Sequence, residues 1–475
     1  MRARGRLIGD QRYKIERIKP EQVRVAPMRR RRPPTPAPLV LLYGFAVLIA
    51  IGTFLLTLPI SSAHGGWTPL LDALFTATSA VCVTGLVVVD TGTYWSGFGQ
   101  TVIMFLIQIG GFGFMTSSTL LLLLVIRRRT RLSDRVMVKE TMGTGELGNV
   151  AGLVRRVAAF TIVAEGVGMV VLTISFLLQG VAAPTALWFG AFHSISAFNN
   201  AGIDLLGSIG HYSLRGLQTD YLLLGGLGVL IVLGGLGYAI IEDVARRRQW
   251  RRLALETKVV LLATLALIIT GTLAIAALEW DNPQTLGSLA PDQRVYNALF
   301  ESITLRTAGF SALNTAALLE PTIFIVMALM FIGGASGSTA GGIKVNTFSV
   351  LLITIISTAR GLPSAEVFGR RLEHIVVYRA LAVALLSIAV LFIVSLLLEI
   401  ISHDGFVDVL FEAVSGLATV GASRGITATL PDPAQVVLIV AMFVGRLGPL
   451  TLVLALTARR RAVPYRHAVE SIRIG

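Results

Sequence analysis

The sequence predicts an all-α integral membrane protein with eight transmembrane helices, arranged as four pseudo-symmetric helix–pore-loop–helix repeats around one pore. Three observations lead to this prediction: an apolar composition, eight long apolar runs, and a short segment that recurs four times. Of the 475 residues, 54% are hydrophobic and 14% are charged, and the mean hydropathy is +0.75. Soluble domains carry about 25% charged residues, so the composition indicates a membrane protein.

The apolar runs are long enough to span a bilayer, which takes about 20 residues in a helix. They lie at about 39–59, 101–126, 157–179, 221–241, 258–278, 322–356, 376–401 and 435–457. A signal peptide is the alternative for the first run, because small residues follow it. The apolar part of a signal peptide has only about 7–15 residues, so we interpret this run as a spanning helix.

The charges are distributed unevenly, and the net charge is +14. A basic chain can bind nucleic acid, but here Lys and Arg cluster between alternate apolar runs, as at 127–129 and 246–248, while Asp residues prevail in the other segments. Cytoplasmic loops are enriched in Lys and Arg. We therefore predict a multi-pass protein of the cytoplasmic membrane with both termini in the cytoplasm, in contact with lipid and with no nucleic acid as partner.

These boundaries divide the chain into seven units. They are a basic cytoplasmic tail (1–38), repeat 1 (39–126), a cytoplasmic linker (127–150), repeat 2 (151–252), repeat 3 (253–371), repeat 4 (372–460) and a cytoplasmic C-terminal tail (461–475). The single cysteine, Cys82, excludes a disulfide framework. No HExxH or GxSxG motif occurs, so we predict no enzymatic activity and no organic cofactor.

Each repeat contains a short apolar segment that runs from Phe to Gly and is too short to span. The four segments lie at 75–85, 192–202, 300–309 and 411–421; three keep ten residues from Phe to Gly, and the third keeps nine. Such segments are candidates for re-entrant pore loops. A second motif follows each one, namely IGGFG at 109–113, LGGLG at 233–237, IGGASG at 332–337 and VGRLG at 444–448. Four copies in register predict an internal duplication.

The glycine at the end of each segment suits cation binding. A dehydrated cation needs oxygen ligands, which rings of backbone carbonyls supply. Glycine adopts the positive φ that such a backbone path requires, and a short helix before it points its partly negative end at the ion. Simple turn glycines are the alternative for any single segment.

Four motifs together carry a family resemblance: the Phe-to-Gly segments, VTGLVVVDTGTYWS at 83–96, LRTAGFSALNT at 305–315 and GASGSTAGGIK at 334–344. With them the chain resembles the Ktr/Trk/HKT superfamily of K⁺ transporters, and most closely the membrane (KtrB-type) subunits of Ktr systems. The resemblance implies a K⁺ selectivity filter. Its residues would be Cys82, Val83, Thr84, Gly85, Asn199, Asn200, Ala201, Gly202, Arg306, Thr307, Ala308, Gly309, Ala418, Thr419, Val420 and Gly421.

The stretch 333–344 interrupts the sixth apolar run with a sequence of poor helix propensity, and the resemblance implies that it is an intramembrane gating loop. The gating residues would be Gly334, Ala335, Ser336, Gly337, Ser338, Thr339, Ala340, Gly341, Gly342, Lys344 and Arg446. Arg446 either pairs with this loop or snorkels to the surface. We expect Arg306 to brace a loop, Glu165 to pair between helices and His193 to be packed.

The resemblance also implies potassium uptake by a homodimer under the control of a cytosolic, nucleotide-binding RCK ring. That ring would dock on the basic segments 127–139, 246–252 and 360–371, for which contact with lipid headgroups is the alternative. K⁺ would be the transported ion. Na⁺-coupled or weakly selective cation transport is the alternative function. An alternating-access transporter is disfavoured, because such proteins are usually built from inverted or parallel repeats with intramembrane carboxylates.

Overall fold

The computed structural model describes residues 37–112, 150–211 and 213–448. These residues belong to one compact unit. The predicted basic tail, cytoplasmic linker and C-terminal tail lie almost entirely outside the described residues, and so do the ends of the second and eighth apolar runs. The first proposed docking segment, 127–139, lies outside them as well.

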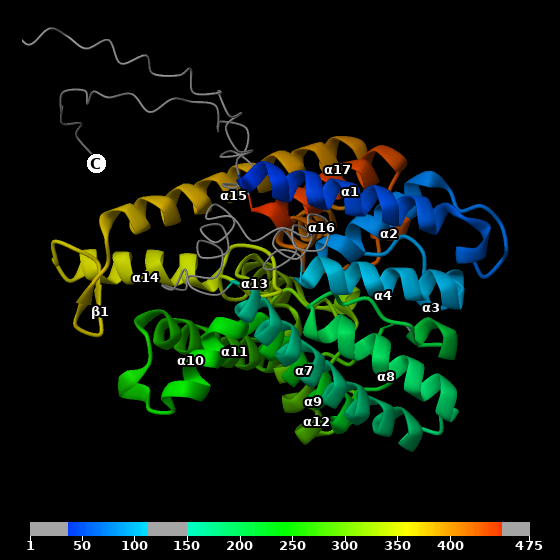
Figure 1. Cartoon of the computed structure of the whole chain (residues 1–475), viewed down its shortest axis with the longest axis horizontal. Helices are drawn as coiled ribbons and strands as arrows, with labels where there is room; N and C mark the ends of the chain where they lie inside the picture. The colour runs from blue at the N-terminus through cyan, green and yellow to red at the C-terminus, as the bar shows by residue number, and fades with distance from the viewer. Residues whose placement is uncertain (1–36, 113–149, 212, 449–475) are drawn as a thin grey trace, which may run out of the picture. The chain divides into compact units, whose positions relative to one another are not determined.

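The described residues are mostly helical (Figure 1). The helices are α1 (Ala37–Thr57), α2 (Leu70–Cys82), α3 (Thr91–Tyr94), α4 (Gly97–Phe112), α7 (Val150–Leu178), α8 (Ala183–Phe198), α9 (Tyr221–Leu236), α10 (Tyr238–Arg247), α11 (Leu255–Glu279), α12 (Pro291–Thr304), α13 (Glu320–Phe331), α14 (Val345–Ala359), α15 (His374–Ile401), α16 (Phe406–Ala418) and α17 (Asp432–Leu447). A small antiparallel hairpin pairs β1 (Glu366–Val367) with β2 (Arg370–Arg371).

Three helical stretches within the described residues are long and apolar enough to cross a membrane, namely Val154–Leu178, Leu255–Glu279 and His374–Ile401. A fourth joins them if α9 and α10, which are bent by 92° at one break, count as a single span. The sixth apolar run forms two shorter helices, α13 and α14, on either side of the predicted loop. The helical class is therefore confirmed, whereas the count of eight spans stays a prediction.

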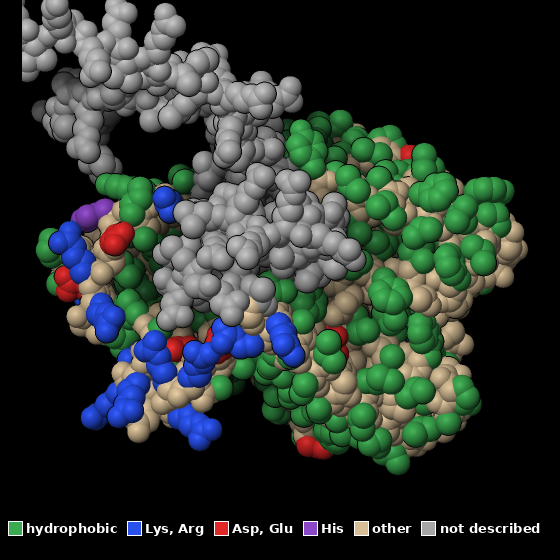
Figure 2. All heavy atoms as spheres, in the orientation of Figure 1, with side chains coloured by type: hydrophobic (Ala, Val, Ile, Leu, Met, Phe, Trp, Pro, Cys, Tyr) green, Lys and Arg blue, Asp and Glu red, His purple; other side chains and the backbone are tan. Residues whose placement is uncertain are grey.

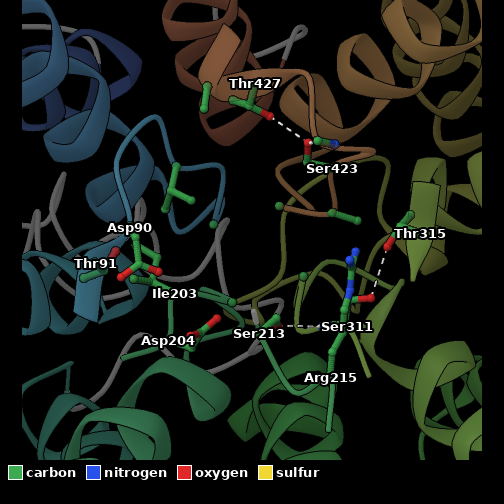
Figure 3. A pocket seen from close by; sticks show the side chains of 18 residues that line it. Asp90, Thr91, Ile203, Asp204, Ser213, Arg215, Ser311, Thr315, Ser423 and Thr427 are labelled. Atoms are coloured by element: carbon green, nitrogen blue, oxygen red, sulfur yellow. Dashed lines mark hydrogen bonds between the residues drawn. The ribbon is translucent and has the colours of Figure 1, made fainter. Parts of the chain in front are cut away.

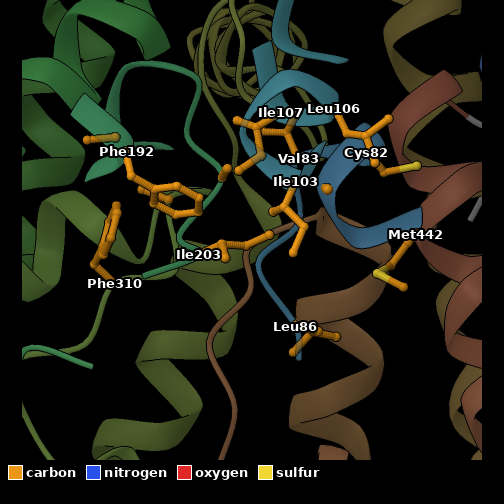
Figure 4. Close-up of a cluster of buried hydrophobic side chains, with 14 of the residues drawn as sticks. Cys82, Val83, Leu86, Ile103, Leu106, Ile107, Phe192, Ile203, Phe310 and Met442 are labelled. Carbon is orange, nitrogen blue, oxygen red and sulfur yellow. The ribbon is translucent and has the colours of Figure 1, made fainter. Parts of the chain in front are cut away.

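The four Phe-to-Gly segments form short helices, α2, α8, α12 and α16, which have 13, 16, 14 and 13 residues. A 16-residue helix is only about 24 Å long, which is less than the thickness of the hydrocarbon core. The first residue of each segment anchors its helix. Phe75, Phe192, Phe300 and Phe411 are all buried in the core. Figure 4 shows Phe192 within this core, together with Phe310 and Ile203.

The helix that follows each short helix contacts the short helix of the next repeat, and these contacts form a closed cycle. Helix α4 packs against α8, α9 against α12, α13 against α16, and α17 against α2, so that the last helix of the series contacts the first short helix. This closed order brings the C-terminal ends of all four short helices toward a common centre.

Glycines of the second motif let α4, α9 and α17 approach the C-terminal ends of the short helices closely. A Cβ built on Gly110, Gly234 or Gly445 would overlap the main-chain carbonyl of Val81, Phe198 or Leu417, respectively. In each case the carbonyl lies four residues before the glycine that ends the Phe-to-Gly segment. The motif therefore serves close packing, as small residues commonly do between membrane helices.

We predict that Gly234→Ala destabilises the fold by about 1–3 kcal/mol, because the added methyl group would overpack against a backbone carbonyl. The control is Gly166→Ala in α7, where a Cβ would meet nothing within 4 Å and where Ala is the better helix former. Thermal unfolding in detergent, followed by tryptophan fluorescence, compares the two variants. Equal melting temperatures would show that the α8–α9 contact is loose.

Candidate functional site

Four glycines, one from each Phe-to-Gly segment, lie side by side in a ring. A Cβ built on Gly85, Gly202, Gly309 or Gly421 would overlap a carbonyl oxygen of the next segment, and the order closes on itself. The overlapped oxygens belong to Ala201, Ala308, Val420 and Thr84, in that order. Each of these residues directly precedes a ring glycine. The ring therefore contains no space for side chains at the glycine positions.

In all four segments the ring glycine and the residue two positions before it have left-handed backbone geometry, with positive φ. The glycines have φ between +66° and +99°, and the residues two positions earlier have φ between +51° and +76°. The earlier residues are Val83, Asn200, Thr307 and Thr419. Positive φ is unfavourable for any residue with a Cβ, and most of all for the β-branched valine and threonines. Backbone strain of this kind concentrates at functional sites.

Hydrogen bonds at the ends of the short helices hold this strained backbone. In the first segment Thr84 N–H donates to the Ser79 carbonyl at 2.8 Å, and Gly85 N–H donates to the Ser79 hydroxyl at 3.1 Å. Ser415 accepts the equivalent pair of N–H groups in the fourth segment at 2.9 and 3.1 Å. Each short helix thus ends at the ring, where the negative end of its dipole favours a cation.

The residue directly after each segment's first Phe braces the chain beyond the ring in three of the four segments. His193 Nε2 accepts from Leu205 N–H at 3.3 Å, and Glu301 Oε1 accepts from Ala312 N–H at 2.8 Å. Glu412 Oε1 accepts a backbone N–H in the corresponding loop at 3.3 Å. His193 is fully buried, which confirms the expected packing. Its bracing role was missed, although its shared position with the two glutamates could have revealed it.

A polar pocket opens on one side of the ring and has the four glycines among its lining residues. Asp90 and Asp204 lie on one side of it and Arg215 with Ser311 on the other (Figure 3). Burial raises the pKa of the Asp204 carboxyl to about 6, and the negative charge of Asp90 adds to this shift. Asp204 also accepts a hydrogen bond from Leu206 N–H at 3.0 Å. We call this pocket the vestibule.

The loop 332–344 connects α13 to α14 and lies against the ring segments. A Cβ on Gly333 would lie 3.2 Å from the Thr307 methyl group, and one on Gly341 would lie 3.0 Å from Thr419 Cβ. The Thr339 hydroxyl is 3.1 Å from the Asn200 side-chain oxygen. The loop therefore touches the second, third and fourth segments.

A break between α9 and α10 supplies backbone acceptors for the loop. Gly237 has φ +76° and ψ 155°, which stops the helix, and helical donors are then missing for the carbonyls of Gly234 and Gly235. These carbonyls accept from Thr339 N–H at 3.3 Å and Ala335 N–H at 2.8 Å. The broken helix thus satisfies a non-helical loop, which an apolar environment requires.

Arg446 lies beside the same loop and is only 3% exposed. Its guanidinium donates to the Thr339 carbonyl at 2.5 Å and to the Gly110 carbonyl at 3.0 Å. This burial excludes the snorkelling alternative. The predicted contact between Arg446 and the loop is confirmed.

Two other cationic side chains donate to carbonyls of the loop, namely Lys344, the last residue of the loop, and Arg306 of the third segment. Lys344 Nζ donates to the Ala340 carbonyl, and Arg306 donates to the Gly333 carbonyl at 3.5 Å. Arg306 thus contacts the loop 332–344, whereas its expected role as a brace of the third pore loop stays a prediction. The roles of all these residues in ion binding and gating stay predictions.

Asn199, at the start of the second predicted filter stretch, directs its side chain away from the ring. Its amide nitrogen donates to Glu165 of α7 at 3.1 Å. The expected pairing of Glu165 between helices is thus confirmed. Cys82, at the start of the first stretch, is a fully buried free thiol.

Basic side chains gather over α10 and the β1–β2 hairpin on the face shown in Figure 2. Two of the predicted docking segments, 246–252 and 360–371, lie here. Part of the charge is balanced within α10, where Arg246 pairs with Glu242 at 2.6 Å and Arg247 with Asp243 at 2.5 Å.

Apolar helices around a strained ring of backbone carbonyls define a helical membrane protein with a candidate cation site at its centre. The chain belongs to the TrkH family of cation transport proteins, whose sequence profile matches residues 39–461.

The relatives of the chain agree with this assignment. It is 39% identical over 422 residues to the Ktr system potassium uptake protein B of Bacillus subtilis (strain 168), covering 88% of this chain and 92% of that protein. It is 36% identical to the potassium/sodium uptake protein NtpJ of Enterococcus hirae, covering 91% of this chain and 96% of that protein. The crystal structure of the potassium transporter TrkH from Vibrio parahaemolyticus superimposes with a TM-score of 0.70 at 20% identity, covering 91% of this chain and 87% of the other, and so shares the fold. The predicted resemblance to the Ktr/Trk transporters is confirmed.

We predict that Gly85→Ser lowers the ratio of K⁺ to Na⁺ flux about tenfold. Its Cβ would collide with the Ala201 carbonyl, and displacing one set of oxygens perturbs a coordinating ring without removing it. The matched control is Gly65→Ser, which has a similar positive φ of +70° but open space around it. Flux into proteoliposomes measures both variants. An unchanged ratio in Gly85→Ser would remove Gly85 from the site.

Proposed function

We propose that the protein mediates potassium uptake across the cytoplasmic membrane through a channel-like pore, with the glycine ring as its selectivity filter. The single observation that carries this proposal is the closed ring of four glycines, in which the carbonyl before each glycine adjoins the preceding segment. Several carbonyls around one axis can replace the water shell of a monovalent cation. Four helix C-terminal ends add negative potential at the same place.

Two kinds of support favour K⁺ as the ion. Relatives at 38–39% identity are named potassium uptake proteins, and each of the four segments here keeps its glycine. Na⁺-coupled or weakly selective cation transport is the second candidate, because another relative is named a potassium/sodium uptake protein.

We further propose that the loop 332–344 is the gate. It lies against the ring segments, and its contacts include backbone hydrogen bonds, the Thr339 hydroxyl and three cationic side chains. Its glycines have low-energy alternative conformers, so a modest bias can shift it. In this proposal a homodimer carries a cytosolic, nucleotide-binding RCK ring on the basic segments near α10 and the hairpin. The cytosolic RCK ring then biases the gate through Lys344 and α14.

Cation uptake into proteoliposomes that contain the purified full-length protein tests the function itself. K⁺ and Rb⁺ are expected to enter faster than Na⁺, and Na⁺ faster than Li⁺ or at a similar rate. Comparable rates for all four ions would favour the weakly selective alternative. Flux that strictly requires both K⁺ and Na⁺ would favour coupled transport.

Deleting residues 336–340 should raise K⁺ flux severalfold and leave the preference for K⁺ over Na⁺ nearly unchanged, because the loop and the ring are separate elements. Thr339→Val is the milder companion variant. It removes the hydroxyl contacts to the Phe198 carbonyl and the Asn200 side chain and should give a smaller increase. A folded deletion variant with wild-type flux would contradict the gate assignment.

The vestibule should make uptake sensitive to pH on its own side of the membrane. The Asp204 carboxyl, with a pKa of about 6, is mainly charged at pH 7.5 and mainly neutral at pH 5, while Asp90 and Arg215 are the other charged groups of the pocket. Acidification should therefore weaken cation attraction and raise the K⁺ concentration needed for half-maximal flux. Asp204→Asn should show the weakened state at pH 7.5 and a flatter pH profile. An unaltered profile in this variant would exclude Asp204 as the responsive group.

A further inference from the structure

Glu165 lies in the middle of α7 and is the only acidic residue of that helix. Its side chain is 8% exposed, and α7 is apolar enough to span a membrane. A carboxyl group at such a place is expensive and needs partners. Its role is not explained by the ring or the gate, neither of which it touches directly.

The partners of Glu165 come from two other helices. Gln108 of α4 donates its side-chain N–H to one carboxyl oxygen at 3.2 Å, and Asn199, directly after α8, donates to the other at 3.1 Å. Asn199 also donates to the Gln108 side-chain oxygen at 2.9 Å. The three side chains thus form a closed triangle. The Ser194 hydroxyl, which donates to the Glu165 carbonyl at 2.6 Å, ties α8 to the same turn of α7.

The donors and acceptors of this triangle fit in only one way. Asn199 uses its amide nitrogen toward both neighbours, and this nitrogen, which carries two hydrogens, also lies 2.9 Å from the Ile195 carbonyl. Gln108 uses its oxygen toward Asn199 and its nitrogen toward Glu165. Position 165 must therefore accept from two N–H groups. A carboxylate does this, whereas an amide has one acceptor oxygen and would place a second donor against a donor.

Asn199 transmits this constraint to the ring. The next residue, Asn200, has the positive φ of +60° that starts the strained path of the second segment. On its other side, Asn200 contacts the loop through Thr339 at 3.1 Å. Gly111 packs so closely on the Asn199 side chain that a Cβ there would overlap the amide. The second segment is thus held from α7 and α4 through Asn199, and it contacts the loop through the Thr339 hydroxyl.

We propose that Glu165 is a positioning residue for cation discrimination: its carboxylate holds Asn199, and Asn199 sets the backbone of the second ring segment. This inference rests on the proposed function. It assigns Glu165 no contact with the ion. The remaining segments lack such a triangle among the described residues, so the second segment is the one whose geometry depends on a carboxylate in a neighbouring span.

An exchange of partners tests this proposal. Glu165→Gln alone leaves a donor against a donor, and Gln108→Glu alone places two carboxylates together. The double variant, Gln108→Glu with Glu165→Gln, restores every hydrogen bond with the carboxylate moved to α4. We expect the ratio of K⁺ to Na⁺ flux to fall about fivefold or more in each single variant and to return to within about twofold of wild type in the double variant.

Asn199→Ala provides a second route if a single exchange variant does not fold. It should shift the flux ratio in the same direction as Glu165→Gln, and combining the two should add little, because both break one link. Size-exclusion profiles in detergent confirm folding. Single variants with reduced yield but wild-type ratios, or an exchange variant no better than the singles, would overturn the proposal. The flux ratio can be measured whichever cation the wild type prefers. A wild-type protein that does not prefer K⁺ would therefore refute the proposed function without deciding the role of Glu165.

Discussion

Backbone carbonyls that are not used within helices are the constraint on which the rest of this structure depends. Four segments leave helical geometry at one place, and in an apolar environment every such group needs a partner or a hydrated cavity. The four short helices end at this place, so their C-terminal carbonyls are directed toward it. The N–H groups of the same segments are satisfied in part by hydroxyl groups, since Ser79 accepts from Gly85 and Ser415 accepts from Gly421. The carbonyls of Thr84, Ala201, Ala308 and Val420 lie around the glycine ring, and the proposed function assigns them to the ion.

The same constraint explains the parts around the ring. Helix α9 stops at Gly237, and its freed carbonyls accept N–H groups of the loop 332–344. Arg446 donates to two further carbonyls from within the protein. Close approach of α4, α9 and α17, which glycines permit, brings these groups within reach. Loop, broken helix and Arg446 therefore form one hydrogen-bonded system that packs against the ring segments.

Much of this site could be predicted from the sequence, because four copies of one pattern reinforce each other. The common place of the glycines, the position of the loop and the contact of Arg446 with it all followed from the repeats or from the family resemblance. The left-handed backbone at Val83 and Thr419 could not be predicted, since β-branched residues normally avoid it. The partners of Glu165 were also hidden, because Gln108 and Asn199 meet it only through tertiary packing. Gln108, Asn199 and Glu165 have no counterparts in the other repeats, so the sequence offered no recurring pattern that would have paired them.

Anomalous diffraction from crystals grown in Rb⁺ tests the central claim most directly, because it locates the ion independently of any transport assay. A Rb⁺ peak should lie on the axis of the ring, within coordination distance of the carbonyls of Thr84, Ala201, Ala308 and Val420. The same protein in Na⁺ should show weaker density for an ion there. A ring without Rb⁺, with the ion bound only in the vestibule near Asp90 and Asp204, would contradict the account.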